Sequence, residues 1–190
     1  EAWPKKDLEM LSSLTPQIEA GAAKVEKAVL PGILRDKKQA WDDGVKKLGV
    51  IVAEYKSAAG AKDLTKLLDA GERLHSQFEA LVRIVRPVLK EVDDFHAVLY
   101  RLWHYELDSF DLSAIQTSAR QLKEKMTPLN AAALPERMKS KQEAFETIRR
   151  DLSKAVDDLA LLAGAGKDDK AIKDAISAVH TRYQALEQVF

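Results

Sequence analysis

The stretch AVLPGILRDKKQAW, residues 28–41, recurs as AALPERMKSKQEAF at residues 132–145, an offset of 104 positions. Alanine, leucine, proline and lysine return at the same places, and Trp41 is matched by Phe145. Self-similarity of this kind indicates a duplicated structural unit, whose copies share one arrangement of helices. The duplication decides how the rest of the chain is divided.

The repeat extends beyond the quoted stretch. AAGAKD at 58–63 matches LAGAGKD at 162–168 with one extra residue, and GERLHSQFEAL at 71–81 then matches ISAVHTRYQAL at 176–186. His75 therefore pairs with His180, and Phe78 pairs with Tyr183. The two copies cover about 8–85 and 112–190, while the segment from Pro87 to Asp111 has no counterpart before residue 8.

Apolar residues follow a helical period throughout the chain, without strand alternation. We predict an all-α fold, a duplicated up-down antiparallel bundle of about seven helices. The first half, 1–86, has three helices, and the second, 87–190, is a four-helix bundle.

Thr15 is predicted to cap a helix that starts at Pro16, and Pro87 either kinks one helix or separates two. The predicted helices span roughly 5–29, 33–58, 63–86, 88–107, 112–126, 136–162 and 168–189.

Composition excludes several classes of partner. The 30 basic and 30 acidic residues balance, which predicts no nucleic-acid binding. No apolar run is long enough for a membrane span. The chain begins EAWPKK, without a methionine or an apolar signal segment, so we expect a periplasmic or secreted protein, with a cytoplasmic location as the alternative. The short first half could share the central helix, pack on the second half, or pair with another chain, as in a homodimer or with a protein partner.

The segment FETIRRDLSKAVDDLALLAGAGKDDKAIKDAISAVHTRY, which ends at Tyr183, resembles the last two helices of the cytochrome c′ family. The resemblance implies a four-helix bundle with covalent haem held by Cys-x-x-Cys-His on the last helix. Here His180 and His75 match the haem-ligating histidine. Covalent haem is excluded, because the two cysteine positions hold other residues in both halves, Ile176 and Val179 in one and Gly71 and Leu74 in the other.

The histidines are the candidate site. His180 lies at the edge of the apolar stripe of its helix, and His96 lies at the edge of the stripe of the predicted helix 88–107. In an up-down bundle these two helices are neighbours, so His180, His96 and, in the first half, His75 are candidate ligands of a metal ion or non-covalent haem. The alternative is that each histidine is hydrogen-bonded to a carbonyl or carboxylate. The candidate pocket-lining residues are Tyr183, Tyr100, Phe78 and Trp103.

No phosphate-binding loop, HExxH or nucleophile motif occurs, and the protein is not expected to be an enzyme. Two functions fit the pattern. The first is a non-catalytic binding or sensing module that holds a metal ion or haem near His96 and His180. The second is a structural or protein-interaction bundle without a small ligand. The aromatic cluster YRLWHYELDSF, residues 100–110, is a candidate partner surface or ligand pocket.

Overall fold

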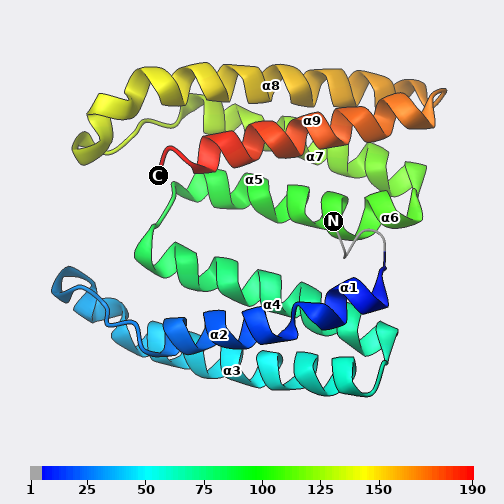
Figure 1. Ribbon diagram of the computed structural model, residues 1–190. Helices are drawn as coiled ribbons and strands as arrows, with labels where there is room; N and C mark the ends of the chain where they lie inside the picture. The colour runs from blue at the N-terminus through cyan, green and yellow to red at the C-terminus, as the bar shows by residue number, and fades with distance from the viewer. Residues whose placement is uncertain (1–5) are drawn as a thin grey trace. The chain divides into compact units, whose positions relative to one another are not determined.

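The computed structural model describes residues 6–190 and divides into two compact units (Figure 1). The first unit ends at Pro87, and the second runs from Val88 to Phe190. Helices build both units, and the described residues contain no β-strand. The predicted all-α fold is therefore confirmed.

The first unit is built on three long helical segments. Its described elements are α1 (Leu8–Ser13), α2 (Thr15–Glu26), the 3₁₀ turn η1 (Gly32–Lys37), α3 (Lys38–Gly60) and α4 (Leu64–Val85). α3 packs against both α2 and α4, and the chain runs in opposite directions along successive long helices (Figure 1). Among the described residues of this unit, no helix covers the side where α2 and α4 face one another.

Pro16 divides the first predicted helix into α1 and α2. Proline has no N–H to donate to the preceding turn, so the helix is interrupted where it enters. The prediction that Thr15 is the N-cap is wrong. Thr15 is the first helical residue of α2, and the N-cap is Leu14, whose side chain makes no capping hydrogen bond.

The second unit is a four-helix bundle, as predicted. Its first segment is α5 (Lys90–Arg101), which continues through one π-helical turn, η2 (Leu102–Glu106), into α6 (Leu107–Ser109). The other three segments are α7 (Leu112–Ala131), α8 (Gln142–Ala165) after the 3₁₀ turn η3 (Glu136–Lys141), and α9 (Asp169–Glu187). α5 contacts α7 and α9, and α8 contacts the same two helices, which closes the bundle.

Two prolines behave differently from one another. Pro87 separates helices, because Arg86 leaves the helical region with φ −130° and ψ 74°, as residues before proline tend to do. Pro128 lies inside α7, so the prediction that this helix ends at residue 126 is wrong. Leu129 beyond it is fully buried, and Arg149 Nη1 donates to the carbonyls of Leu129 and Ala132 at 3.2 and 2.7 Å. These contacts hold the last helical turn in place.

The two units repeat their turns and caps as well as their sequence. Asp7 and Asp111 cap α1 and α7, each accepting from the amide three residues ahead. Asp63 and Asp168 cap α4 and α9 in the same way. A carboxylate at this position satisfies an amide that has no partner within the helix. The duplication inferred from the sequence is thus seen at matching places in each unit.

The two units differ in their cores. In the second unit the buried apolar residues form one continuous cluster to which all four helical segments contribute. In the first unit they form two smaller clusters, one around Tyr55 and Leu67 and the other around Leu48 and Leu81. Tyr55 fixes α1 to α3 through a hydrogen bond from its hydroxyl to the carbonyl of Leu11, 2.7 Å long, and burial raises its pKa.

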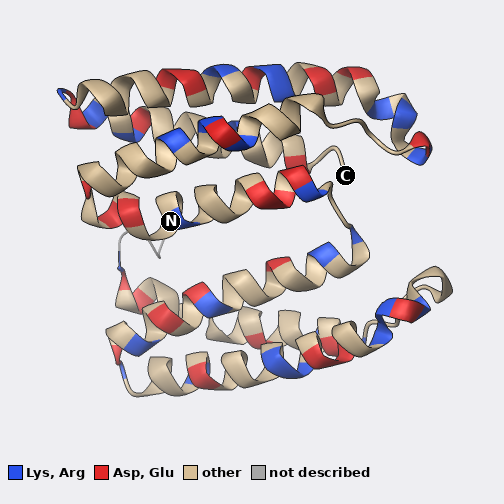
Figure 2. Cartoon of the chain, turned by 180° about the vertical axis from the view of Figure 1, so that it is seen from behind, with Lys and Arg blue, Asp and Glu red and all other residues tan. Residues whose placement is uncertain are grey.

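Acidic and basic side chains alternate along the helices of each unit, without a large area of one sign (Figure 2). Pairs such as Lys38–Asp42 and Lys170–Asp174 lie one turn apart on exposed faces. Across residues 6–190, no helix has both the length and the apolar character that crossing a bilayer requires.

The Asp63 cap predicts an acid-dependent loss of stability. Its hydrogen bond from the Lys66 amide, together with the Lys66 side chain, lowers the carboxyl pKa below its ordinary value of 3.8. The folded state binds this proton more weakly than the unfolded state. The contribution to stability is therefore fully present above about pH 3.8 and is lost as the pH falls below 3.8 through the lower pKa of the folded state. In urea unfolding between about pH 5 and pH 2, the parent protein should lose stability more steeply than Asp63→Asn, which keeps a cap but cannot titrate. Parallel pH curves would contradict this assignment.

Candidate functional site

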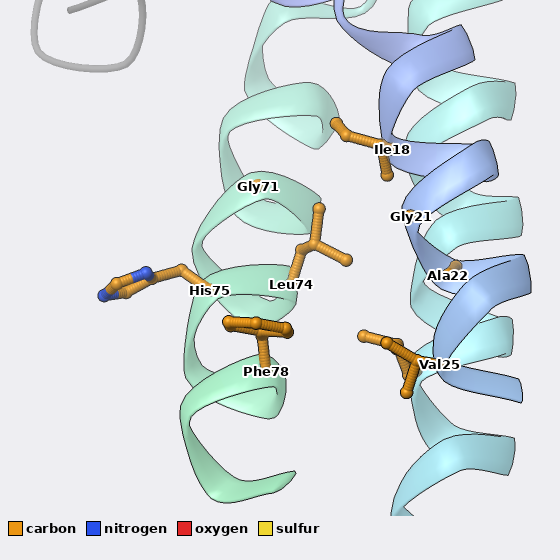
Figure 3. A pocket seen from close by; sticks show the side chains of 9 residues that line it. Ile18, Gly21, Ala22, Val25, Gly71, Leu74, His75 and Phe78 are labelled. Atoms are coloured by element: carbon orange, nitrogen blue, oxygen red, sulfur yellow. The ribbon is translucent and has the colours of Figure 1, made fainter. Parts of the chain in front are cut away.

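An apolar groove runs between α2 and α4 in the first unit, with α3 as its floor (Figure 3). It encloses a pocket of about 370 Å³, a volume in the range of small-ligand and side-chain binding sites. Leu74 of α4 and Val25 of α2 point toward each other across it (Figure 3). The pocket is lined by Ile18, Gly21, Ala22, Val25, Leu48, Gly71, Leu74, His75 and Phe78.

The sequence of the two walls leaves the groove open. On α2, Ile18, Ala22 and Val25 follow the spacing of one helix face, and Gly21 next to them has no side chain. A Cβ at Gly21 would meet nothing within 4 Å. On α4, Gly71 is similarly small. The walls therefore have an apolar surface but too little side-chain volume to fill the space between them.

α2 lies at the surface although one face of it is apolar. None of its residues is buried, whereas the matching helix of the second unit, α7, buries Ile115, Ser118, Ala119, Leu122, Met126 and Leu129. Phe78 on the opposite wall is 50% exposed. Large apolar side chains exposed along one continuous groove are typical of a binding surface.

The second unit shows what normally covers this surface. Applying the repeat offsets, Ile18 matches Leu122 and Val25 matches Leu129, and both of these residues of α7 are fully buried. Phe78 matches Tyr183, which is only 2% exposed. In the second unit α5 packs on both α7 and α9, and its Phe95 and His96 stack on Tyr183. The first unit has no described helix at the corresponding place.

A row of aromatic rings joins α5 and the η2 turn to α9. We call it the aromatic row, and its members are His96, Tyr100, Trp103, His180 and Tyr183. His96 stacks on Tyr183 with ring centroids 4.7 Å apart and planes 1° from parallel, and Trp103 stacks on His180 at 4.0 Å and 8°. His96 also meets the edge of Tyr100 at 5.8 Å. These rings hold the first helix of the bundle against the last one.

The predicted site residues therefore fall into two groups. His96, His180, Tyr100, Trp103 and Tyr183 come together in the aromatic row of the second unit. His75 and Phe78 line the groove of the first unit, where His75 projects from the outer flank of α4 (Figure 3).

Both imidazoles of the aromatic row face an aromatic ring from the opposite helix, and His75 lies 3.5 Å from the carboxylate of Glu79. Within residues 6–190, no group of three or more histidine, cysteine, aspartate or glutamate side chains is arranged to hold a metal ion. The metal-ion or haem site at His180, His96 and His75 stays a prediction.

Sequence reasoning missed two features of the first unit. Glu72 and His75 have the Glu-x-x-His spacing of carboxylate-bridged metal sites, and Glu72 is buried, at 8% exposure. The groove itself was also not foreseen. One available signal was that the segment from Pro87 to Asp111 has no counterpart before residue 8. Another was the change of Lys125 and Met126 in the second copy to the smaller Gly21 and Ala22 in the first.

A close contact joins α3 and α4, the helices that form the floor and one wall of the groove. Gln77, 7% exposed, donates from Nε2 to the carbonyl of Gly44 at 3.0 Å. A Cβ at Gly44 would lie 2.7 Å from Leu81 Cδ2, so a larger residue at this position would require the Leu81 side chain to shift. The second unit has Ile148 at the corresponding position. α4 is thus anchored on α3, and its other face is left to the groove.

Comparison with known proteins returned no matching family model, curated protein or solved structure. The resemblance to cytochrome c′ accordingly remains a prediction from the residues quoted above.

Proposed function

We propose that the protein is a non-catalytic binding module and that the groove between α2 and α4 is its binding site. The observation that carries the proposal is the difference between matching residues of the two units. Leu122, Leu129 and Tyr183 are buried in the second unit, where α5 packs on both α7 and α9, and their counterparts line an open groove in the first unit.

The chemistry of the groove supports binding of an apolar surface. His75, at the rim, is the single titratable side chain among the lining residues. Apolar surface removed from water contributes about 25 cal/mol per Å² to association. A ligand that covers Phe78, Leu74 and Ile18 would gain this contribution without having to desolvate a charged group.

Filling the groove should weaken binding of a dye with an apolar aromatic body. Gly21→Trp places a large side chain where Gly21 has open space, and it removes a helix glycine, which favours helix by about 0.5 kcal/mol. We expect the fluorescent dye anilinonaphthalenesulfonate to bind the parent chain at one site and to bind this variant at least tenfold more weakly. The measurement is a fluorescence titration of the full chain.

Gly49→Trp is the matched control. Gly49 is also a helix glycine with nothing within 4 Å of an added Cβ, but it does not line the groove. This variant should bind the dye as the parent does, and circular dichroism should show the same helix content for all three proteins. Equal dye binding by Gly21→Trp and the parent would refute the groove as the binding site.

A further inference from the structure

We infer that the partner bound in the groove is a single amphipathic helix with the apolar pattern of α5, lying antiparallel to α2 and α4. This inference rests on the proposed function and names the chemistry of the ligand. α5 is the template, because it occupies the place in the second unit that is open in the first.

The first support is the register of ring contacts. Along α5 and the η2 turn that continues it, the residue number rises from His96 to Trp103, while the partners of these residues on α9 fall from Tyr183 to His180. α5 is thus antiparallel to α9, and the same is true of α5 and α7 (Figure 1). α2 and α4 run parallel to each other, as α7 and α9 do, so both walls fix the same orientation for a bound helix (Figure 1).

The second support is the apolar stripe that such a helix needs. α5 buries Val92, Phe95, Val98 and Leu99, and the stripe continues to Leu102 in η2. Phe95 stacks on Tyr183 with centroids 6.1 Å apart, and Tyr183 corresponds to the half-exposed Phe78 of the groove. An aromatic side chain at the position of Phe95 would therefore pack on Phe78.

The third support is a polar contact at one end of the groove. Arg101 Nη2 donates to Gln121 Oε1 of α7 at 2.6 Å. The residue of the first unit that corresponds to Gln121 is also a glutamine, Gln17, which is exposed on α2. A basic residue in the partner helix, six positions after its aromatic anchor, would make the same hydrogen bond. This contact fixes both the register and the orientation of the partner.

These three contacts define the partner chemically. It is a helix of about five turns with apolar residues at i, i+3, i+7 and i+10. The residue at i+3 is aromatic, and a basic residue at i+9 directly precedes the last apolar residue. Binding an amphipathic helix along an apolar groove is a common mode of peptide recognition. Here the second unit serves as an internal example of the complex.

The test uses a synthetic peptide of residues 88–109 and the full 190-residue chain. A lactam between the side chains of Lys90 and Asp94, which pair on the exposed side of α5, keeps the peptide helical and lowers the cost of ordering it. The peptide carries a fluorophore at its N-terminus, and binding is followed by anisotropy. We expect one peptide per chain, and at least tenfold weaker binding for the same peptide with Phe95→Ala.

The chain variants separate the groove from other binding sites. Gly21→Trp should weaken peptide binding at least tenfold, and Gly49→Trp should leave it unchanged. If Gly21→Trp binds the peptide as tightly as the parent chain does, the inference is overturned. The peptide would then be binding outside the groove, by exchanging with α5 of the second unit. Self-association of the chain that depends on an open Gly21 position, together with failure to bind the peptide, would also overturn it and would identify a second copy as the occupant.

Failure of this inference is distinguishable from failure of the proposed function. If the dye binds in a manner that depends on Gly21 but the peptide does not bind, the groove is a binding site for a different ligand. If neither binds, both proposals fail.

The orientation is tested by cross-linking, since the chain has no cysteine of its own. A short bifunctional maleimide should join His75→Cys in the chain to a peptide with cysteine at position 103, because Trp103 stacks on the matching His180. A peptide with cysteine at position 88 lies about 22 Å further along the helix and should not react. Preferential reaction at position 88 would overturn the antiparallel orientation.

Discussion

Tyr183→Ala should destabilise the second unit by about 3–5 kcal/mol, as expected when a large aromatic is removed from a packed core. Tyr183 is 2% exposed and supports two rings of α5, Phe95 at 6.1 Å and His96 at 4.7 Å. Its removal leaves a cavity and loosens the first helix of the bundle from the last. Thermal unfolding followed by circular dichroism should show a fall in the melting temperature of about 15 °C or more.

Phe78→Ala is the matched substitution in the first unit. The two positions correspond in the repeat, but Phe78 is 50% exposed and no described helix covers it. Its replacement should cost about 1 kcal/mol or less, since most of the contact area that Tyr183 buries is absent there. Equal losses from the two substitutions would contradict the asymmetry on which the proposed function depends.

Arg149→Ala should destabilise the second unit by about 1–3 kcal/mol, the cost of leaving partly buried carbonyls without donors. Arg149 donates to the carbonyls of Leu129 and Ala132, and its guanidinium also lies 5.0 Å from the ring centroid of Phe145. These contacts fix the end of α7 beyond Pro128. Denaturant unfolding of the variant gives the change in stability directly.

Its control is the adjacent arginine. Arg150→Ala removes the same side chain from an exposed position, and surface substitutions of this kind stay within about 0.5 kcal/mol of the parent. Arg149→Lys should recover little of the lost stability, because a single ammonium group does not reproduce the planar guanidinium that reaches both carbonyls. Full recovery by lysine would show that charge alone matters at this position.

The helical fold and its duplication could be predicted because both depend on patterns that are local or repeated in the sequence. Asp7, Asp63, Asp111 and Asp168 lie at helix starts in each copy, and apolar residues recur at the helical period between them. The position of Pro87 as a separator was left open, since the outcome depends on the conformation of Arg86. Local sequence alone favoured an end of α7 near Pro128, and tertiary contacts from Arg149 overrode that preference.

The candidate site was harder to predict because it results from something the first unit lacks. His75 and Phe78 were identified as site residues from their place in the repeat, but the predicted chemistry was that of a metal or haem ligand. The groove depends on the small size of Gly21 and Ala22 across from them, on a different helix. Which small residues face an open space can be decided only when the neighbouring helices are placed.

The π-helical turn η2 is a place where the chain can lose one residue without disrupting the bundle. The amide of Leu107 donates to the carbonyl of Leu102, five residues back, so both leucines reach the core although they are too widely spaced for an α-helix. Loss of one residue at His104 or Tyr105 would restore α-helical spacing and keep both leucines in phase. The same loss near Phe95 would turn the rest of the helix by about 100°. A single-residue deletion is therefore accommodated at this turn without changing which face of the helix meets the bundle.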